Sequence, residues 1–150
     1  LDFETNPVFE VVVEARDSGG LTDTAVVTIN LTDVVETRTL RMDILSDSFR
    51  TKGRGKVEVA IFGEADFDVR SIDVATVRFG ATGTEDSLSH HKKRGARVSY
   101  RDVNGDGIVD VVFTFEIRRA GFSRGDTMGF FTAKTLDGQD LFAEDAVNVR

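Results

Sequence analysis

The stretch from residue 102 to residue 110 combines acidic side chains with two glycines, and its spacing suits a calcium ion. Calcium binds six to eight oxygen ligands at about 2.3 to 2.6 Å. Oxygen-bearing side chains stand at alternate positions here, and Gly107 permits the sharp turn that brings later oxygens toward the same centre. The predicted ligands are the side chains of Asp102, Asn104, Asp106 and Asp110 and the main-chain carbonyl of Ile108.

A simpler explanation is that Asn104-Gly105 and Asp106-Gly107 are turn dipeptides whose polar side chains face water. Crowding argues against it, because carboxylates in one tight loop repel each other unless a cation neutralises them. A complete EF-hand has a bidentate glutamate at the twelfth loop position, where this chain has Phe113. The stretch instead resembles the shortened calcium loops of bacterial extracellular repeats, dockerins and integrin-type propeller blades, in which the metal fastens a loop to a strand.

The composition is that of a soluble globular protein, with 40% hydrophobic and 30% charged residues. The chain has no cysteine, which excludes disulfides, zinc-thiolate sites and thiol catalysis. Calcium is therefore the obvious stabilising cross-link for an extracellular protein of this composition. No apolar run approaches the roughly 20 residues that cross a bilayer, so we expect no membrane span. Because the sequence starts at Leu1 without Met or a signal pattern, we expect a fragment of a longer chain. We expect that chain to be secreted or to lie on the cell surface.

Negative charge is concentrated at the beginning of the chain. Residues 1–38 contain eight acids and two bases, whereas the remainder contains 18 acids and 17 bases. A nucleic-acid-binding protein would carry excess positive charge on one face. The sequence therefore argues against nucleic acid as a partner.

Two β-rich runs, Phe9–Ala15 and Ala25–Leu31, flank the turn cluster Asp17-Ser18-Gly19-Gly20 and predict an antiparallel hairpin. Together with Leu1-Asp2-Phe3-Glu4 and the run from Val27 to Asp33, they resemble the last third of a cadherin repeat. That resemblance implies a Greek-key sandwich with calcium at the junctions between repeats. It assigns Asp2 and Glu4 to the junction with the following domain, Asp17 to the junction with the preceding one, and Asp33 to the linker.

The linker departs from the cadherin pattern, since Val35 and Thr37 replace the two asparagines that the family uses. One weakly held ion, or a solvated linker without an ion, are both compatible with it. Two or three strands are marginally stable alone, so residues 1–36 must pack on something else or remain loose.

Residues 37–150 read as a second, all-β domain with alternating apolar side chains and intervening turns. About seven strands predict a two-sheet antiparallel sandwich, with room for one helical turn near Asp68–Ala75. The predicted strands are Thr39–Leu45, Lys56–Phe62, Ala75–Phe79, Ala96–Arg101, Val109–Ile117, Thr127–Lys134 and Leu141–Val149.

The order of motifs in this domain resembles a module near the C-termini of large bacterial secreted proteins. The run from Gly55 to Gly63, the segments around Phe67 and Val77, and the loop 102–110 carry the likeness. It implies a calcium-stabilised appendage rather than a catalyst. The loop directly precedes a strand that the pattern predicts to be central, so an ion held in the loop would fix how that strand enters the sheet.

Other ionisable residues give weaker signals. Asp66, Asp68 or Asp73 could fold back to complete the calcium shell, with Asp73 preferred, although helix capping or solvent exposure explains them equally well. His90 and His91 lie in a polar loop beside Lys92, Lys93 and Arg94, without a third ligand at a spacing that suits a transition metal.

Enzyme chemistry finds no support in the sequence. No nucleophile-elbow pattern frames Ser89 or Ser99, and Gly53-Arg54-Gly55 lacks the rest of a phosphate-binding loop. We predict a calcium-binding structural or adhesion module, and the partners we expect are neighbouring domains of the same chain and another cell-surface protein or a glycan. The alternative is a glycan- or ligand-binding module of a secreted enzyme, which the absence of Trp and the single Tyr100 disfavour.

Overall fold

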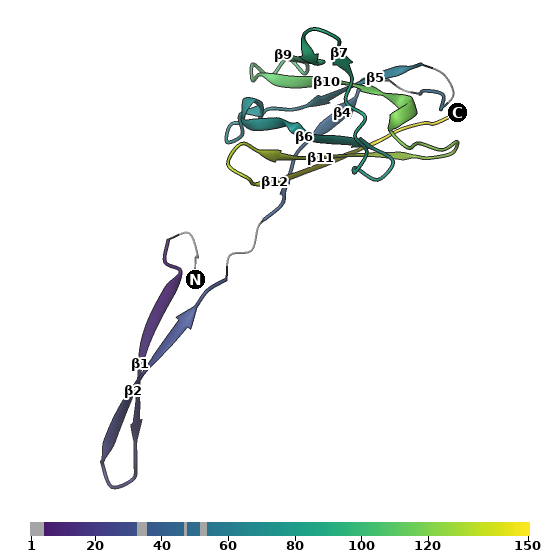
Figure 1. The fold of residues 1–150 in the computed structure, drawn as a ribbon. Helices are drawn as coiled ribbons and strands as arrows, with labels where there is room; N and C mark the ends of the chain where they lie inside the picture. Colours follow the sequence, from purple (N-terminus) through teal and green to yellow (C-terminus); the bar gives the residue numbers. More distant parts are fainter. Residues whose placement is uncertain (1–4, 33–35, 47, 52–53) are drawn as a thin grey trace. The chain divides into compact units, whose positions relative to one another are not determined.

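The computed structural model describes residues 5–32, 36–46, 48–51 and 54–150 and is built almost entirely from β-strands (Figure 1). The predicted all-β class is confirmed. The chain divides into two compact units, Leu1–Val35 and Glu36–Arg150.

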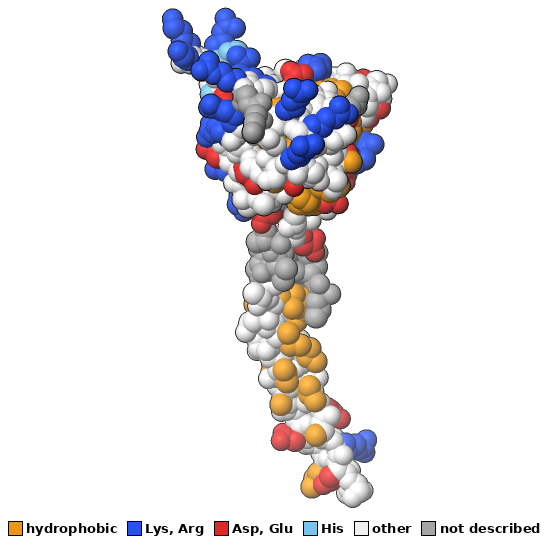
Figure 2. Space-filling view, turned by 90° about the vertical axis from the view of Figure 1, so that its right-hand side faces the viewer, with side chains coloured by type: hydrophobic (Ala, Val, Ile, Leu, Met, Phe, Trp, Pro, Cys, Tyr) orange, Lys and Arg blue, Asp and Glu red, His pale blue; other side chains and the backbone are white. Residues whose placement is uncertain are grey.

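The first unit contains one antiparallel hairpin of β1 (Val8–Arg16) and β2 (Thr22–Asn30), as the sequence predicts. Residues paired across the strands share a face, so the pairs Phe9–Ile29, Val11–Val27 and Val13–Ala25 form one apolar face. Most of these side chains are exposed, and orange side chains follow the hairpin in Figure 2. Within the described part of this unit, no further strand covers that face.

The second unit contains two four-stranded sheets. One has the order β4-β5-β10-β9 and is antiparallel throughout. The other has the order β3-β12-β11-β6, in which only the β3–β12 pair is parallel. The strands are β3 (Arg38–Thr39), β4 (Met42–Ile44), β5 (Lys56–Ile61), β6 (Ile72–Gly80), β9 (Val98–Arg101), β10 (Asp110–Glu116), β11 (Met128–Thr135) and β12 (Asp140–Ala146).

The two sheets enclose one apolar core. Strand β10 directs Val111, Phe113 and Phe115 inward, where each side chain is completely buried. The rings of Phe113 and Phe131 lie 5.8 Å apart, and those of Phe79 and Phe115 lie 4.7 Å apart, so both contacts join one sheet to the other. Burial of large aromatic side chains is the main stabilising term of such a sandwich.

Three short elements add to this frame. A 3₁₀ turn, η1 (Val69–Ser71), lies where the sequence allows one helical turn, and η2 (Ile117–Arg119) follows β10. A small hairpin of β7 (His90–His91) and β8 (Gly95–Ala96) precedes β9. The sequence did not predict this hairpin, because its run of polar residues has no apolar alternation.

The predicted strand Thr39–Leu45 is two strands in the structure. Residues 38–39 pair with β12 in one sheet, and residues 42–44 pair with β5 in the other. The chain changes sheets between them: the amide of Leu40 donates to the carbonyl of Phe142, and the carbonyl of Arg41 accepts from the amide of Phe62.

Candidate metal centre

The loop predicted to bind calcium connects β9 to β10 in the first sheet. The last ladder pair before it is Arg101 with Asp110, so residues 102–109 form the whole connection. Gly105 and Gly107 have φ angles of 77° and 84°, values that L-amino acids with side chains seldom adopt. The two glycines therefore allow the successive turns that give the loop its shape.

Asp102 holds the first half of the loop together. One of its carboxylate oxygens accepts the amide of Gly105 at 2.6 Å, and the other accepts the amide of Gly107 at 2.9 Å. A carboxylate oxygen has two lone pairs, so each oxygen retains one for a further partner. Asp102 itself lies on the surface.

Asn104 and Asp106 are bonded to each other and to the main chain. The Asn104 side-chain oxygen accepts the Asp106 amide at 3.0 Å, and its Nδ2 donates to Asp106 Oδ2 at 2.9 Å. Asp106 Oδ1 accepts the amide of Ile108 at 2.8 Å. These bonds lower the pKa of Asp106, the Ile108 amide contributing most and Asn104 next, with a smaller contribution from the positive charge of Arg41.

This lowered pKa gives a first test. Replacement of Asn104 by alanine removes one donor to the Asp106 carboxylate, so the Asp106 pKa is expected to rise toward its ordinary value. A carboxyl-detected NMR titration of both proteins measures the change. The amide resonances of Gly105 and Gly107, which donate to Asp102, should keep their positions in the variant, and large shifts there would show that the whole loop has rearranged.

Asp110 differs from the other loop acids because it is completely buried. Its Oδ1 accepts the amide of Gly63 at 2.9 Å, and its Oδ2 accepts the amide of Val103 at 2.7 Å. Asp110 thereby ties the start of the loop and the end of β5 to the first residue of β10. A buried carboxylate is tolerated only when such donors replace its water shell.

Gly63 is a component of this centre that sequence analysis missed. A β-carbon built on Gly63 would lie 2.3 Å from the carbonyl oxygen of Val109 and 2.8 Å from Ile108 Cγ2. Only glycine allows the chain after β5 to pass this close to the loop. Its position directly after an alternating apolar strand was the available signal, since a glycine there indicates a close approach of two backbones.

The loop provides hard oxygen donors but no cluster of acids. Within the ranges that the structure describes, no three His, Cys, Asp or Glu side chains lie close enough together to hold a metal ion. An ion in this loop would therefore use mixed oxygens, namely carboxylates with the Asn104 amide and the Ile108 carbonyl. That donor chemistry fits calcium, which accepts carboxylate, amide and main-chain oxygens.

The three acids considered as additional ligands have other partners. Asp73 lies on β6 in the opposite sheet, opposite Lys134, and its Oδ1 accepts the amide of Ala75 at 3.1 Å. Asp68 caps η1 by accepting the amide of Arg70. Asp66 pairs with Arg38 at 2.7 Å, which lowers the pKa of this exposed carboxyl. The structure does not group Asp73 with the loop acids.

The cadherin-like residues fall partly outside the described chain. Asp2, Glu4 and Asp33 lie outside the residues that the structure describes. Asp17 is described and closes the β1–β2 hairpin, where its Oδ1 accepts the amides of Gly19 at 2.8 Å and Leu21 at 2.9 Å. Asp17 acts here as the acceptor of a tight turn.

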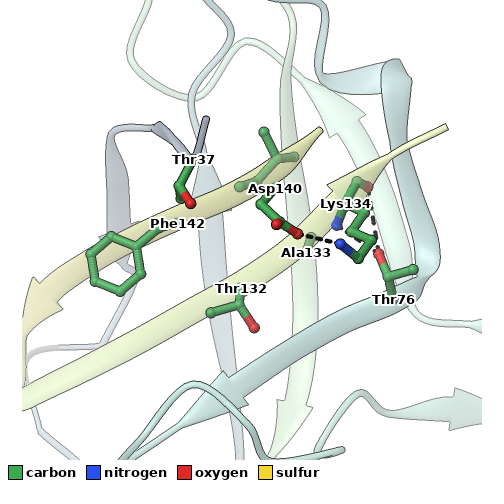
Figure 3. Close-up of a pocket in the computed structure, with 8 residues that line it drawn as sticks. Thr37, Thr76, Thr132, Ala133, Lys134, Asp140 and Phe142 are labelled. Carbon is green, nitrogen blue, oxygen red and sulfur yellow. Dashed lines mark hydrogen bonds and ion pairs between the residues drawn. The ribbon is translucent and has the colours of Figure 1, made fainter. Parts of the chain in front are cut away.

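A second candidate site is a depression of about 390 Å³ on the sheet that contains β6, β11 and β12 (Figure 3). Lys134 and Asp140 form an ion pair across it, and the Thr76 hydroxyl accepts the amide of Lys134 at 2.8 Å. Phe142 supplies one aromatic ring at its edge. The pocket is shallow and has a single ring, a weak basis for binding sugars.

Comparisons with family models, with curated proteins and with solved structures give no match for this chain. No helix in the described ranges is long and apolar enough to span a membrane. The functional argument therefore depends on the geometry of the sites themselves.

Proposed function

We propose that residues 36–150 form a calcium-stabilised, non-catalytic β-sandwich that serves as a structural or adhesive module of a secreted or cell-surface protein. The observation that carries the proposal is the loop at the start of β10. There, oxygens of Asp102, Asn104 and Asp106 are preoriented by hydrogen bonds to the loop's own amides. The Ile108 carbonyl completes the proposed donor set.

The position of this loop explains why an ion would matter. Strand β10 lies between β5 and β9 and supplies the most buried aromatic side chains of its sheet. An ion held by the loop would restrain the β9–β10 connection and neutralise carboxylates that otherwise repel each other. Its benefit would appear as stability of the sandwich, since nothing in the proposal requires catalysis.

Calcium is expected to raise the melting temperature of the chain, and chelation is expected to reverse the rise. A ligand that binds only the folded state at about 100 times its Kd adds about 2.7 kcal/mol of stability. Scanning calorimetry with chelator and calcium back-titration measures this increment. Asp106→Ala should abolish the response to calcium, because the variant loses a central donor.

Asp137→Ala is the matched control, since Asp137-Gly138 repeats the Asp-Gly dipeptide in an exposed turn elsewhere in the same unit. This control should retain the full calcium response. Identical melting curves with calcium and with chelator would contradict the proposal. An equal rise in melting temperature with calcium in Asp106→Ala would show that the ion binds at another site.

The competing proposal is a glycan-binding module that uses the depression beside Phe142. What favours it is the combination of one ring, an ion pair and three threonine side chains on an open sheet face. Calcium-independent binding of a neutral oligosaccharide would favour this function over the first. The loop geometry gives the calcium proposal the stronger basis, because four of its donors lie within seven consecutive residues.

A further inference from the structure

The segment from Ser87 to Arg101 contains no acidic residue, although the whole chain has a formal net charge of −7. It contains five Lys and Arg residues and both histidines of the protein. We call residues 90–97, which span β7, its turn and β8, the basic hairpin. Figure 2 shows blue side chains gathered around the pale blue histidines, where they project from the larger unit.

The basic hairpin is attached to the sandwich by main-chain hydrogen bonds. The amide of Ser89 donates to the carbonyl of Thr114 at 2.8 Å, and the amide of Thr114 donates to the carbonyl of Arg97 at 3.1 Å. Leu88, which is buried, bridges to Phe115 in the core. The base of the hairpin is therefore held by β10, while its tip stands in solvent.

The cations of the hairpin lie close enough to affect one another. His91 is opposite Gly95, and Ser89 is opposite Arg97, so the side chains of His91 and Arg97 share one face. Partial desolvation of the ring lowers the pKa of His91, as does repulsion by Arg97, Arg94 and Lys56. Because three of the causes are neighbouring cations, the ring lies in a locally positive environment.

These cations have no carboxylate partners in the described ranges. No ion pair involves Lys56, Lys92, Lys93, Arg94 or Arg97 among the described residues. Glu116 of β10 lies opposite Lys56 of β5 but forms no ion pair with it. The Nε of Arg97 is buried and finds no acceptor among the described atoms. Such a group is unusual in a folded protein and leaves the Arg97 head group without an internal anion.

We propose that the basic hairpin is a docking surface for an acidic polysaccharide, which its cations bind through sulfate or carboxylate groups. Lys and Arg clusters on short segments are a known means of binding such polymers. The composition of the hairpin argues against single-stranded nucleic acid as its partner. Nucleic-acid single strands are bound by aromatic stacking, and residues 90–97 contain no Phe, Tyr or Trp.

Insertion into a membrane and the apolar centre of a protein interface both require apolar side chains that the hairpin lacks. Ala96 is its only apolar residue, so nothing can insert between lipid tails or form the apolar centre of a protein interface. The hairpin thus lacks the side chains that add to charge in those interactions, which favours a polymer recognised by charge alone. This proposal goes beyond the calcium module, because the hairpin is attached near Thr114, toward the other end of β10, and uses no residue of the loop.

The test measures binding of the 150-residue chain to heparin and to polygalacturonate, with neutral dextran, duplex DNA and anionic phosphatidylserine vesicles as comparison ligands. The triple variant Lys92→Ser, Lys93→Ser, Arg94→Ser should weaken binding to the acidic polysaccharides at least about tenfold. All three residues are exposed, so folding should be unaffected. The His91 pKa, followed by NMR, should rise when heparin binds to the parent chain.

The matched control removes three exposed arginines from elsewhere in the same unit: Arg50→Ser, Arg124→Ser, Arg150→Ser. It changes net charge by the same amount and should leave affinity nearly unchanged. Equal losses in the two triple variants would overturn the proposal, because overall charge would then explain binding. Binding to DNA or to vesicles as tight as that to the polysaccharides, or an unchanged His91 pKa, would also overturn it.

Discussion

Asp110→Ala is expected to destabilise the sandwich by about 3 kcal/mol, whether or not calcium is present. The carboxylate is completely buried and accepts the amides of Gly63 and Val103. Its removal leaves both amides without an acceptor, and each unpaired buried donor costs about 1 to 3 kcal/mol. Urea denaturation of parent and variant, in chelator and in calcium, measures the loss.

Asp102→Ala is the control for this prediction. Asp102 also accepts two amides, those of Gly105 and Gly107, but it does so at the surface, where water can replace the carboxylate. In chelator its loss of stability should be clearly smaller than that of Asp110→Ala. Equal losses for the two variants would show that burial of Asp110 has no special role.

Measuring these variants in chelator and in calcium also separates two roles of Asp110, the anchoring of main-chain amides and the binding of a metal ion. If Asp110 acts only as a calcium ligand, Asp110→Ala should cost nothing in chelator, because there is then no ion to lose. The hydrogen bonds to Gly63 and Val103 predict a cost in both conditions. Asp102→Ala and Asp106→Ala should instead lose mainly the calcium-dependent increment.

Much of the fold could be predicted from alternation alone. The run Lys56 to Phe62 places Val57, Val59 and Ile61 on one face, and the structure buries all three almost completely. Period-two burial leaves a strong trace in sequence, because a shift by one residue would expose every apolar side chain of the strand. The β1–β2 hairpin was predictable from its two β-rich runs and from the glycine-containing turn between them.

The identity of the strand with which a segment pairs leaves no comparable pattern in the sequence. Leu40, Met42 and Ile44 alternate as in one continuous strand and are all buried, yet the chain changes sheets within this segment. Alternation reports which side chains face the core, and both sheets face the same core here. The sequence pattern therefore could not distinguish one strand from two.

In the candidate metal site, too, the local features could be predicted from the sequence and the long-range contacts could not. The local set Asp102, Asn104 and Asp106 could be found from spacing, because turn chemistry acts over a few residues. Gly63 lies 47 positions before Asp110, and their hydrogen bond depends on the register of β5 against β10. Register is a tertiary property, so neither this contact nor the separation of Asp73 from the loop could be derived from the sequence.

Gly63→Ala is expected to cost about 3 kcal/mol of stability and to displace the loop. The added β-carbon would meet the Val109 carbonyl oxygen at 2.3 Å, and a main-chain atom cannot move aside without moving the loop. Gly55→Ala, at the other end of β5, is the matched control, because its β-carbon meets only the flexible end of Ile117 at 3.0 Å.

Urea denaturation should therefore show a large loss for Gly63→Ala and less than about 1 kcal/mol for Gly55→Ala. The amide resonances of Val103, which donates to Asp110, and of Ile108, which donates to Asp106, should shift only in the Gly63 variant, because displacement of the loop alters both hydrogen bonds. Calcium affinity should fall in parallel if the loop holds the ion. A Gly63 variant as stable as the Gly55 variant would show that the loop is not seated against β5 as described.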